Sequence, residues 1–223
     1  MTMKSNLEVV RETIREGVKL IAVSKYHSQE LIKEAYDAGQ RAFGESREQE
    51  LKLKHEALPD DIEWHFIGHL QTNKVKAIVP YISMIQTVDS PRLIAEIEKQ
   101  AARIGRQIDI LLELHLAQED TKTGMTLEAC REFLASGEWR TMRHVRICGI
   151  MAMASNTDDE SLIRKEFTQA SEFFDEVKSR YFLDAPYFKE RSFGMSSDYR
   201  IAMQCGSTMV RIGTAIFGDR SYT

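Results

Sequence analysis

The most restrictive feature of this sequence is a regular alternation of short apolar runs with segments of helical periodicity. Eight such pairs follow one another and use almost all of the 223 residues. A crossover helix returns each strand to the same direction, so the alternation predicts a parallel sheet. Eight units closed on themselves make a (β/α)8 barrel, for which about 250 residues is typical. The expected strands cover residues 18–23, 41–44, 62–67, 81–88, 108–116, 145–153, 191–195 and 208–212.

The intervening segments predict helices and their starting residues. Ser46 and Thr157 each open a capping-box pattern, and Ser90 followed by Pro91 is typical of an N-cap with proline at the first helical position. The alternative architecture, an open doubly wound sheet, lacks its glycine-rich fingerprint after every strand. The sequence therefore predicts one barrel domain over residues 1–223, with a short first helix at about 5–16 and the barrel at about 18–220.

Composition excludes several classes of partner. Thirty Lys and Arg against 34 Asp and Glu give a formal charge of −4, which offers no electrostatic footprint for nucleic acid. The longest apolar stretches are far shorter than the ~20 residues of a membrane helix, and the start lacks the apolar core of a secretory signal. Cys130, Cys148 and Cys205 show no C-x-x-C spacing, so neither a disulfide framework nor a thiolate zinc site is expected. We expect a cytoplasmic protein.

In a barrel of this type the functional groups lie where strands end at their carboxyl side. Lys25 closes the first apolar run. A lysine at the inner rim would be desolvated, which favours the neutral and nucleophilic amine. The alternative, a rim lysine whose amine reaches solvent, stays open.

The last two strands supply a second set of candidates. Arg211 interrupts a β-branched run and points either outward between helices or inward to a hydrogen-bond acceptor. The run continues into Gly213 and Thr214, and the loops after strands seven and eight of such barrels commonly bind phosphate. Ser196 and Ser197 belong to the same rim, although two serines at a helix start are also typical of simple N-caps.

Other chemistry finds little support. His65 and His69 have metal-ligand spacing, but on a strand they would lie about 13 Å apart and could not share one ion. No G-x-S-x-G motif suggests a hydrolase. The remaining polar rim candidates are Asn73, Lys74, Glu113 and the segment Lys122-Thr123-Gly124, with a solvated loop as the default interpretation of Lys122.

Five segments together resemble a known family. They cover residues 21–25, 43–45, 65–74, 194–198 and 206–218, and they read IAVSK, FGE, HFIGHLQTNK, GMSSD and GSTMVRIGTAIFG. This pattern resembles the pyridoxal-phosphate homeostasis proteins, single-domain relatives of the alanine racemase barrel. The likeness keeps the family's order and extends from about residue 7 to residue 220.

The resemblance implies roles for five residues. Lys25 is similar to the lysine that holds pyridoxal 5′-phosphate (PLP) as an aldimine, and Arg211 to the arginine that faces the pyridine nitrogen. Ser196, Gly213 and Thr214 resemble the group that cradles the phosphate. An arginine beside the ring nitrogen weakens the cofactor as an electron sink.

The chain departs from the family pattern at several positions. Ser46 stands where relatives usually carry Asn, which puts a contact with the ring from that position in doubt. Tyr26 follows the lysine where Thr is frequent, and residues 149–154 are a Met-rich variant that would reshape the pocket floor. Whether Lys122 is a second place for the aldehyde to dock is left open.

The resemblance implies a PLP-binding protein of intracellular vitamin B6 homeostasis without strong catalytic activity. Relatives that run reactions add a second β-domain, and this sequence ends directly after the eighth strand's motif. Two alternatives remain, a PLP-dependent racemase or lyase using Tyr26 or Tyr199, and a cofactor-free interaction module. The expected partners are PLP and PLP-dependent apo-enzymes, without metal, nucleic acid or membrane, and the expected state is a monomer with a weak dimer as the alternative.

Overall fold

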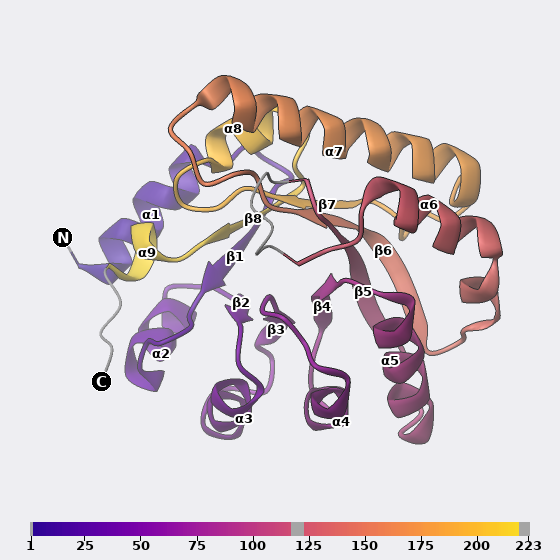
Figure 1. Ribbon diagram of the computed structural model, residues 1–223. Helices are drawn as coiled ribbons and strands as arrows, with labels where there is room; N and C mark the ends of the chain where they lie inside the picture. The colour runs from indigo at the N-terminus through magenta and orange to yellow at the C-terminus, as the bar shows by residue number, and fades with distance from the viewer. Residues whose placement is uncertain (1, 117–122, 219–223) are drawn as a thin grey trace.

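The strands close into a barrel, and the helices surround it. The computed structural model describes residues 2–116 and 123–218, in which eight parallel strands pair in chain order and β8 returns to β1 (Figure 1). The predicted (β/α)8 barrel is confirmed. The strands are β1 Lys19–Val23, β2 Ala42–Glu45, β3 Glu63–Phe66, β4 Met84–Val88, β5 Ile108–Leu114, β6 Val145–Ala152, β7 Glu190–Phe193 and β8 Met209–Ile212.

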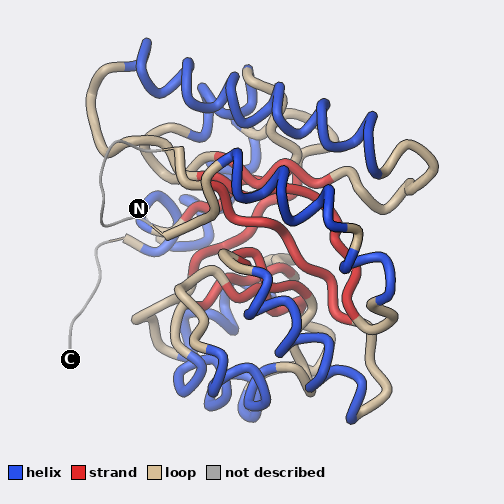
Figure 2. The backbone as a smooth tube through the Cα atoms, turned by 45° about the vertical axis from the view of Figure 1, so that its right-hand side comes forward, coloured by secondary structure: helices blue, strands red, loops and turns tan. Residues whose placement is uncertain are grey.

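The helices form the outer layer, and Figure 2 shows the strands enclosed by it. Between β3 and β4, residues 72–78 form a 3-10 turn followed by a single helical turn. The helices are α1 Met3–Thr13, α2 Gln29–Asp37, α3 Glu48–Ala57, α4 Val75–Ile78, α5 Pro91–Arg103, α6 Leu127–Ser136, α7 Glu160–Tyr181, α8 Tyr199–Gln204 and α9 Thr214–Phe217, with 3-10 turns η1 Thr72–Lys74 and η2 Glu138–Thr141.

The caps agree with the sequence at one helix and differ at two. Ser90 caps α5, because its hydroxyl oxygen accepts the N–H of Leu93 at 3.4 Å. The capping box predicted at Ser46 is wrong, since α3 begins after Arg47 and has no side-chain cap. At α7 the cap is Asp159, whose carboxylate accepts two backbone N–H groups of the first turn. A carboxylate at this position also interacts favourably with the helix dipole.

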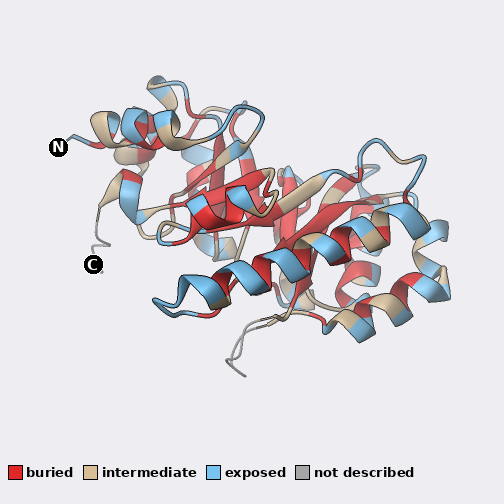
Figure 3. Cartoon of the chain, turned by 90° about the horizontal axis from the view of Figure 1, so that it is seen from above, coloured by how far each residue is buried: buried red, intermediate tan, exposed pale blue. Residues whose placement is uncertain are grey.

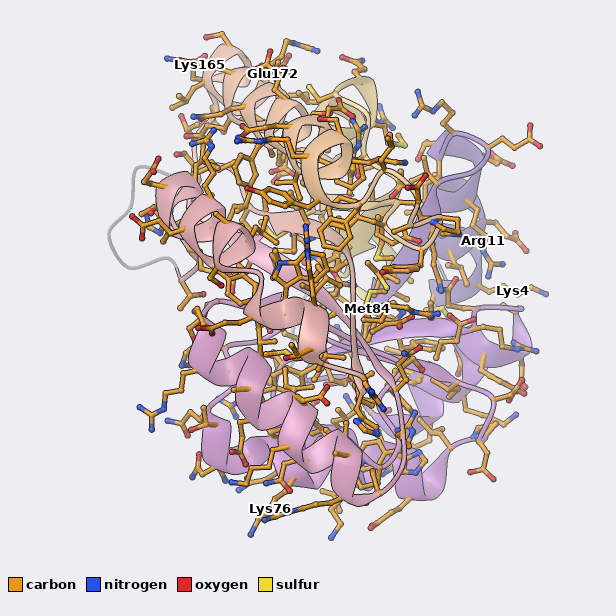
Figure 4. All side chains as sticks on the ribbon, turned by 90° about the vertical axis from the view of Figure 1, so that its right-hand side faces the viewer. Lys4, Arg11, Lys76, Met84, Lys165 and Glu172 are labelled. Atoms are coloured by element: carbon orange, nitrogen blue, oxygen red, sulfur yellow. The ribbon has the colours of Figure 1, made fainter. Side chains whose placement is uncertain are left out.

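Two apolar cores result from the alternation of side chains along each strand. The larger core lies between the strands and the helices, and Figure 3 shows buried residues along one face of α7 and exposed residues along the other. Figure 4 shows Met84 among the strands, while Lys165 and Glu172 project outward from α7. The inner core fills the barrel with Ile21, Ala42, Met84, Leu111, Cys148, Met151 and Met209, and Met153 packs against it.

The three cysteines are free thiols, two of them buried and Cys205 half-buried. In residues 2–116 and 123–218, no helix combines the length and the apolar character that crossing a bilayer requires.

Candidate cofactor-binding site

Lys25 and Arg211 reach the same end of the barrel from neighbouring strands. The backbone of β1 pairs with that of β8, and Ile21 lies opposite Arg211. Lys25 follows β1 by two residues, after the buried Ser24, and its side chain is half-buried. The predicted desolvation of this lysine is therefore partial in the structure. Arg211 lies deeper in the barrel, and Lys25 lies at the mouth above it.

Arg211 points inward, which decides between the two orientations that its sequence position allowed. Only 3% of the residue is exposed. Its Nη1 donates to the backbone oxygen and to Oγ of Ser192, both at 2.6 Å, and its Nη2 donates to the backbone oxygen of Ala152 at 3.2 Å. Among the described residues, the hydrogen bonds of this guanidinium all go to neutral oxygens, and none of them starts from Nε. Burial lowers the pKa of Arg211 to about 10, so it stays a cation at neutral pH.

Three neutral polar side chains continue from Arg211 across the barrel. Ser192 Oγ donates to Gln86 Oε1 at 2.6 Å, and Gln86 Nε2 lies 2.9 Å from His65 Nδ1. Burial lowers the pKa of His65 to about 3, so its ring is neutral and Nδ1 accepts this hydrogen bond. We call these four residues the inner network: His65, Gln86, Ser192 and Arg211.

The sequence interpretation missed this network apart from Arg211. The available signal was a polar residue at an inward position of each of four strands. Which of these side chains meet depends on the register across the closed sheet, which one strand's sequence does not show.

The rest of this rim comes from the segment that joins β7 to β8 and from the turn that follows β8. Ser196 is half-buried, and its Oγ accepts the backbone N–H of Gly213 at 3.3 Å. A Cβ built at Gly213 would lie 3.1 Å from the backbone oxygen of Val23, so glycine allows the loop to lie directly against the end of β1. Thr214 is exposed and begins α9.

The two serines of this segment do not cap the helix that follows. The residue preceding α8 is Asp198, so the N-cap alternative for Ser196 and Ser197 is wrong. Lys25, Arg211, Ser196, Gly213 and Thr214 are thus brought to one end of the barrel, and their role as a binding set stays a prediction.

Behind this rim, between β2 and α3, lies a group of three charges, of which Glu45 and Lys54 are buried and Glu50 is half-buried. Lys54 Nζ donates to Glu45 Oε1 at 2.7 Å and to Glu50 Oε1 at 2.6 Å. Burial raises the pKa of Glu45 to about 7, and its Oε2 has no hydrogen-bond partner. We call Glu45, Glu50 and Lys54 the charged cluster. In the sequence Glu50 and Lys54 have the i,i+4 spacing of an exposed helical ion pair, so the sequence gives no sign that Lys54 is buried.

The other rim candidates separate in the structure. Glu113 is buried in β5, where its Oε1 accepts the Thr123 hydroxyl at 2.9 Å and its Oε2 has no partner; burial raises its pKa. Asn73 is exposed in η1, and Lys74 forms an ion pair with Glu48 at the surface. Lys122 lies outside the described residues.

The two histidines do not share a site. His65 belongs to the inner network, whereas His69 lies beyond β3 rather than on it and pairs at the surface with Asp89 at 3.2 Å. Within residues 2–116 and 123–218, no three His, Cys, Asp or Glu side chains are grouped to hold a metal ion.

The departures from the family pattern also have defined places. Ser46 packs against Gly68, where an added Cβ would lie 2.6 Å from the serine Cβ. Tyr26 adopts φ 66°, and the guanidinium of Arg47 lies 5.1 Å from its ring centroid. Met151 is buried in the inner core, and Met153 packs against that core.

The fold and the site define a barrel of the alanine racemase type. The family model "Alanine racemase, N-terminal domain" matches residues 1–221. The solved alanine racemase of Clostridium difficile 630 has a TM-score of 0.76 and 15% identity, over 98% of this chain and 56% of that chain, which is a likeness of fold alone.

Closer relatives identify the family. A pyridoxal phosphate homeostasis protein of Pasteurella multocida is 35% identical over 100% of both chains, and one of Escherichia coli is 36% identical over 93% of this chain and 88% of that protein. The structure of PipY of Synechococcus elongatus with PLP bound has a TM-score of 0.89 and 34% identity, over 97% of this chain and 100% of that chain. This chain belongs to the pyridoxal phosphate homeostasis proteins, as the resemblance predicted.

Proposed function

We propose that this protein binds pyridoxal 5′-phosphate at the barrel mouth and holds it for PLP homeostasis without strong catalytic activity. Its relatives carry the name of that role, and PipY was solved with the cofactor bound. The binding residues we assign are Lys25, Arg211, Ser196, Gly213 and Thr214.

The placement of Arg211 beneath Lys25 carries this proposal. The cofactor supplies an aldehyde for covalent capture by an amine, a ring nitrogen that accepts a hydrogen bond, and a phosphate. Lys25 offers the amine at the mouth. The Nε–H of Arg211, which has no acceptor among the described residues, offers a donor to the ring nitrogen. The contact between Ser196 Oγ and the N–H of Gly213 marks the turn where backbone N–H groups and the exposed Thr214 would receive the phosphate.

Arg211 also supports a holding role over an enzymatic one. Its charge persists at neutral pH, since its lowered pKa is still about 10. A cation beside the ring nitrogen disfavours protonation of that nitrogen and so weakens stabilisation of a carbanion. Of the two tyrosines named for a racemase, Tyr199 has its hydroxyl 2.8 Å from Thr13 Oγ1 in α1, so this hydroxyl is already engaged by the helical layer.

Covalent capture is tested by absorbance and chemical trapping. The purified protein mixed with PLP should absorb at about 420 nm, the usual band of a protonated pyridoxal imine, and borohydride should fix the label on Lys25. The variant Lys25→Ala should lose the band and the trapped label completely. The matched control is Lys19→Ala, which removes a lysine at the opposite end of the same strand, where it pairs with Glu63. A colourless wild-type protein, or a label that persists in Lys25→Ala, overturns the assignment.

The holding role has its own test. The loaded protein is incubated with L-amino acids in deuterated water, and Cα exchange is compared with that by free PLP. We expect no acceleration, and exchange well above the free cofactor would establish the racemase or lyase alternative. We further expect a cytoplasmic monomer that passes the cofactor to PLP-dependent apo-enzymes.

A further inference from the structure

The charged cluster is attached to the backbone on both sides of Lys25. On the amino side, Lys54 Nζ donates to the Ser24 backbone oxygen at 2.8 Å. The hydroxyl of Ser24 in turn donates to Glu45 Oε1 at 2.6 Å. On the carboxyl side, the backbone N–H of Tyr26 donates to Glu50 Oε1 at 2.6 Å.

The segment that is held in this way has a strained backbone. Tyr26 adopts φ 66°, and it is the one residue other than glycine with positive φ in residues 2–116 and 123–218. Side chains with a Cβ rarely occupy this region, and such a conformation persists only where surrounding structure enforces it. The hydrogen bond from Tyr26 to Glu50 acts directly at that residue. The cluster is thus in a position to enforce the turn that directs Lys25.

The burial of the cluster makes this support rigid. Lys54 is 4% exposed and Glu45 is fully buried. Hydrogen bonds to charged groups are shorter and stronger than neutral ones, and low dielectric strengthens them further. Both carboxylates converge on one ammonium, so a shift of either side chain would also move the neighbouring peptide of Lys25.

We propose that Glu45, Glu50 and Lys54 are positioning residues for Lys25, and this inference rests on the proposed function. They fix the peptide from Ser24 to Tyr26 so that the flexible lysine side chain starts from one direction, toward the barrel mouth. Restricting the reacting amine in this way raises its effective concentration at the aldehyde. In the capture step Lys25 Nζ and the aldehyde carbon form a C=N bond and one water leaves. The cluster exchanges no atom in this step.

Glu50 gives the sharpest test, because it is less buried than its partners and its replacement is less disruptive to the fold. Two replacements separate its role as acceptor for the Tyr26 N–H from its charge. Glu50→Ala removes the acceptor for the Tyr26 N–H, whereas Glu50→Gln keeps an oxygen there. We expect the rate constant for appearance of the ~420 nm band to fall about 10-fold in Glu50→Ala and by no more than about 3-fold in Glu50→Gln. The matched control is Glu56→Ala, which removes the exposed partner of Lys52 on the same helix and should react like wild type.

A comparison within the Lys25→Ala variant shows whether Glu50 positions the lysine or supports the pocket as a whole. In Lys25→Ala, addition of Glu50→Ala should leave the affinity for pyridoxamine 5′-phosphate, which has no aldehyde, unchanged. Thermal unfolding of each variant shows whether the fold persists. The inference is overturned if Glu50→Ala captures PLP as fast as wild type, or if it lowers the affinity for the amine analogue equally. Failure of wild type itself to label Lys25 overturns the proposed function, which is a different result.

Discussion

The inner network and the charged cluster lie beneath the same end of the barrel and surround their cations in opposite ways. Arg211 is held by neutral oxygens of Ser192 and Ala152 and keeps an N–H without an acceptor among the described residues. Lys54 is clasped by two carboxylates and a backbone oxygen, which satisfy all three of its donors. A cation with neutral partners keeps charge and donors for a ligand. A cation with carboxylate partners has its charge neutralised and its donors used within the protein, so it has none left for a ligand.

The two regions should also differ in the free energy that is lost when their cation is removed. Removal of one member of a buried ion pair leaves an uncompensated charge in low dielectric, which costs more than a lost neutral hydrogen bond. The charged cluster should therefore matter first for stability, and the inner network first for binding.

The largest effect is expected from Lys54→Met, which breaks the charged cluster with little change in volume. Glu45 and Glu50 would lose their shared cation, and we expect the free energy of unfolding to fall by about 3–5 kcal/mol. Chemical denaturation measures this change. Lys52→Met is the matched control, since Lys52 lies on the same helix in an exposed pair with Glu56 at 3.7 Å, and it should change stability by less than about 1 kcal/mol. Equal losses of stability in Lys54→Met and Lys52→Met would show that the charged cluster contributes no more than an exposed ion pair.

Arg211→Met applies the same kind of change to the inner network. It should reduce stability less than Lys54→Met does, and it should weaken PLP binding. Only neutral acceptors lose their donor, so we expect a stability loss of about 1–3 kcal/mol. Loss of the donor to the ring nitrogen should weaken retention of PLP about 10-fold, as measured by equilibrium dialysis. A variant that retains the cofactor like wild type would show that Arg211 is structural, as Lys54 is.

The sequence predicted the barrel because eight alternations repeat one local signal that does not depend on any single residue. It also placed Lys25 at the end of the first strand and Arg211 within the last strand, but it could not orient Arg211. Val210 and Ile212 on one face of this strand and Met209 on the other are all buried, so both faces are apolar and alternation carries no information about direction.

Residues whose roles depend on tertiary contacts were missed for a different reason. Gln86 and Ser192 lie 106 positions apart and meet only because the sheet closes. The burial of Lys54 follows from the docking of the turn after β1 onto α3. The capping box at Ser46 shows the same limit, because packing of Ser46 against Gly68 overrides the local preference.

The last prediction compares the two regions through pH. His65, in the inner network, has its pKa lowered by burial from 6.5 to about 3. Between about pH 3 and pH 6.5 the imidazole is therefore protonated in the unfolded chain and neutral in the folded protein. The free energy of unfolding consequently decreases as the pH falls through this range. Glu45, in the charged cluster, has its pKa raised by burial from 4.5 to about 7. Its contribution is complete below pH 4.5 and is lost as the pH rises through about 7, so the two slopes oppose each other between pH 4.5 and 6.5.

Isosteric variants separate these slopes. His65→Asn keeps a hydrogen-bond acceptor that does not titrate. Relative to wild type, it should remove a stability loss of about 2 kcal/mol that occurs as the pH falls from about 6.5 to about 5. Glu45→Gln should remove a change of about 1–2 kcal/mol of opposite sign between about pH 5 and pH 7. Urea unfolding across this range measures both. If Glu45→Gln changed the pH slope in the same direction as His65→Asn, the carboxyl would be ionised throughout and held by Lys54, and the charged cluster would be a fully charged triad at every pH tested.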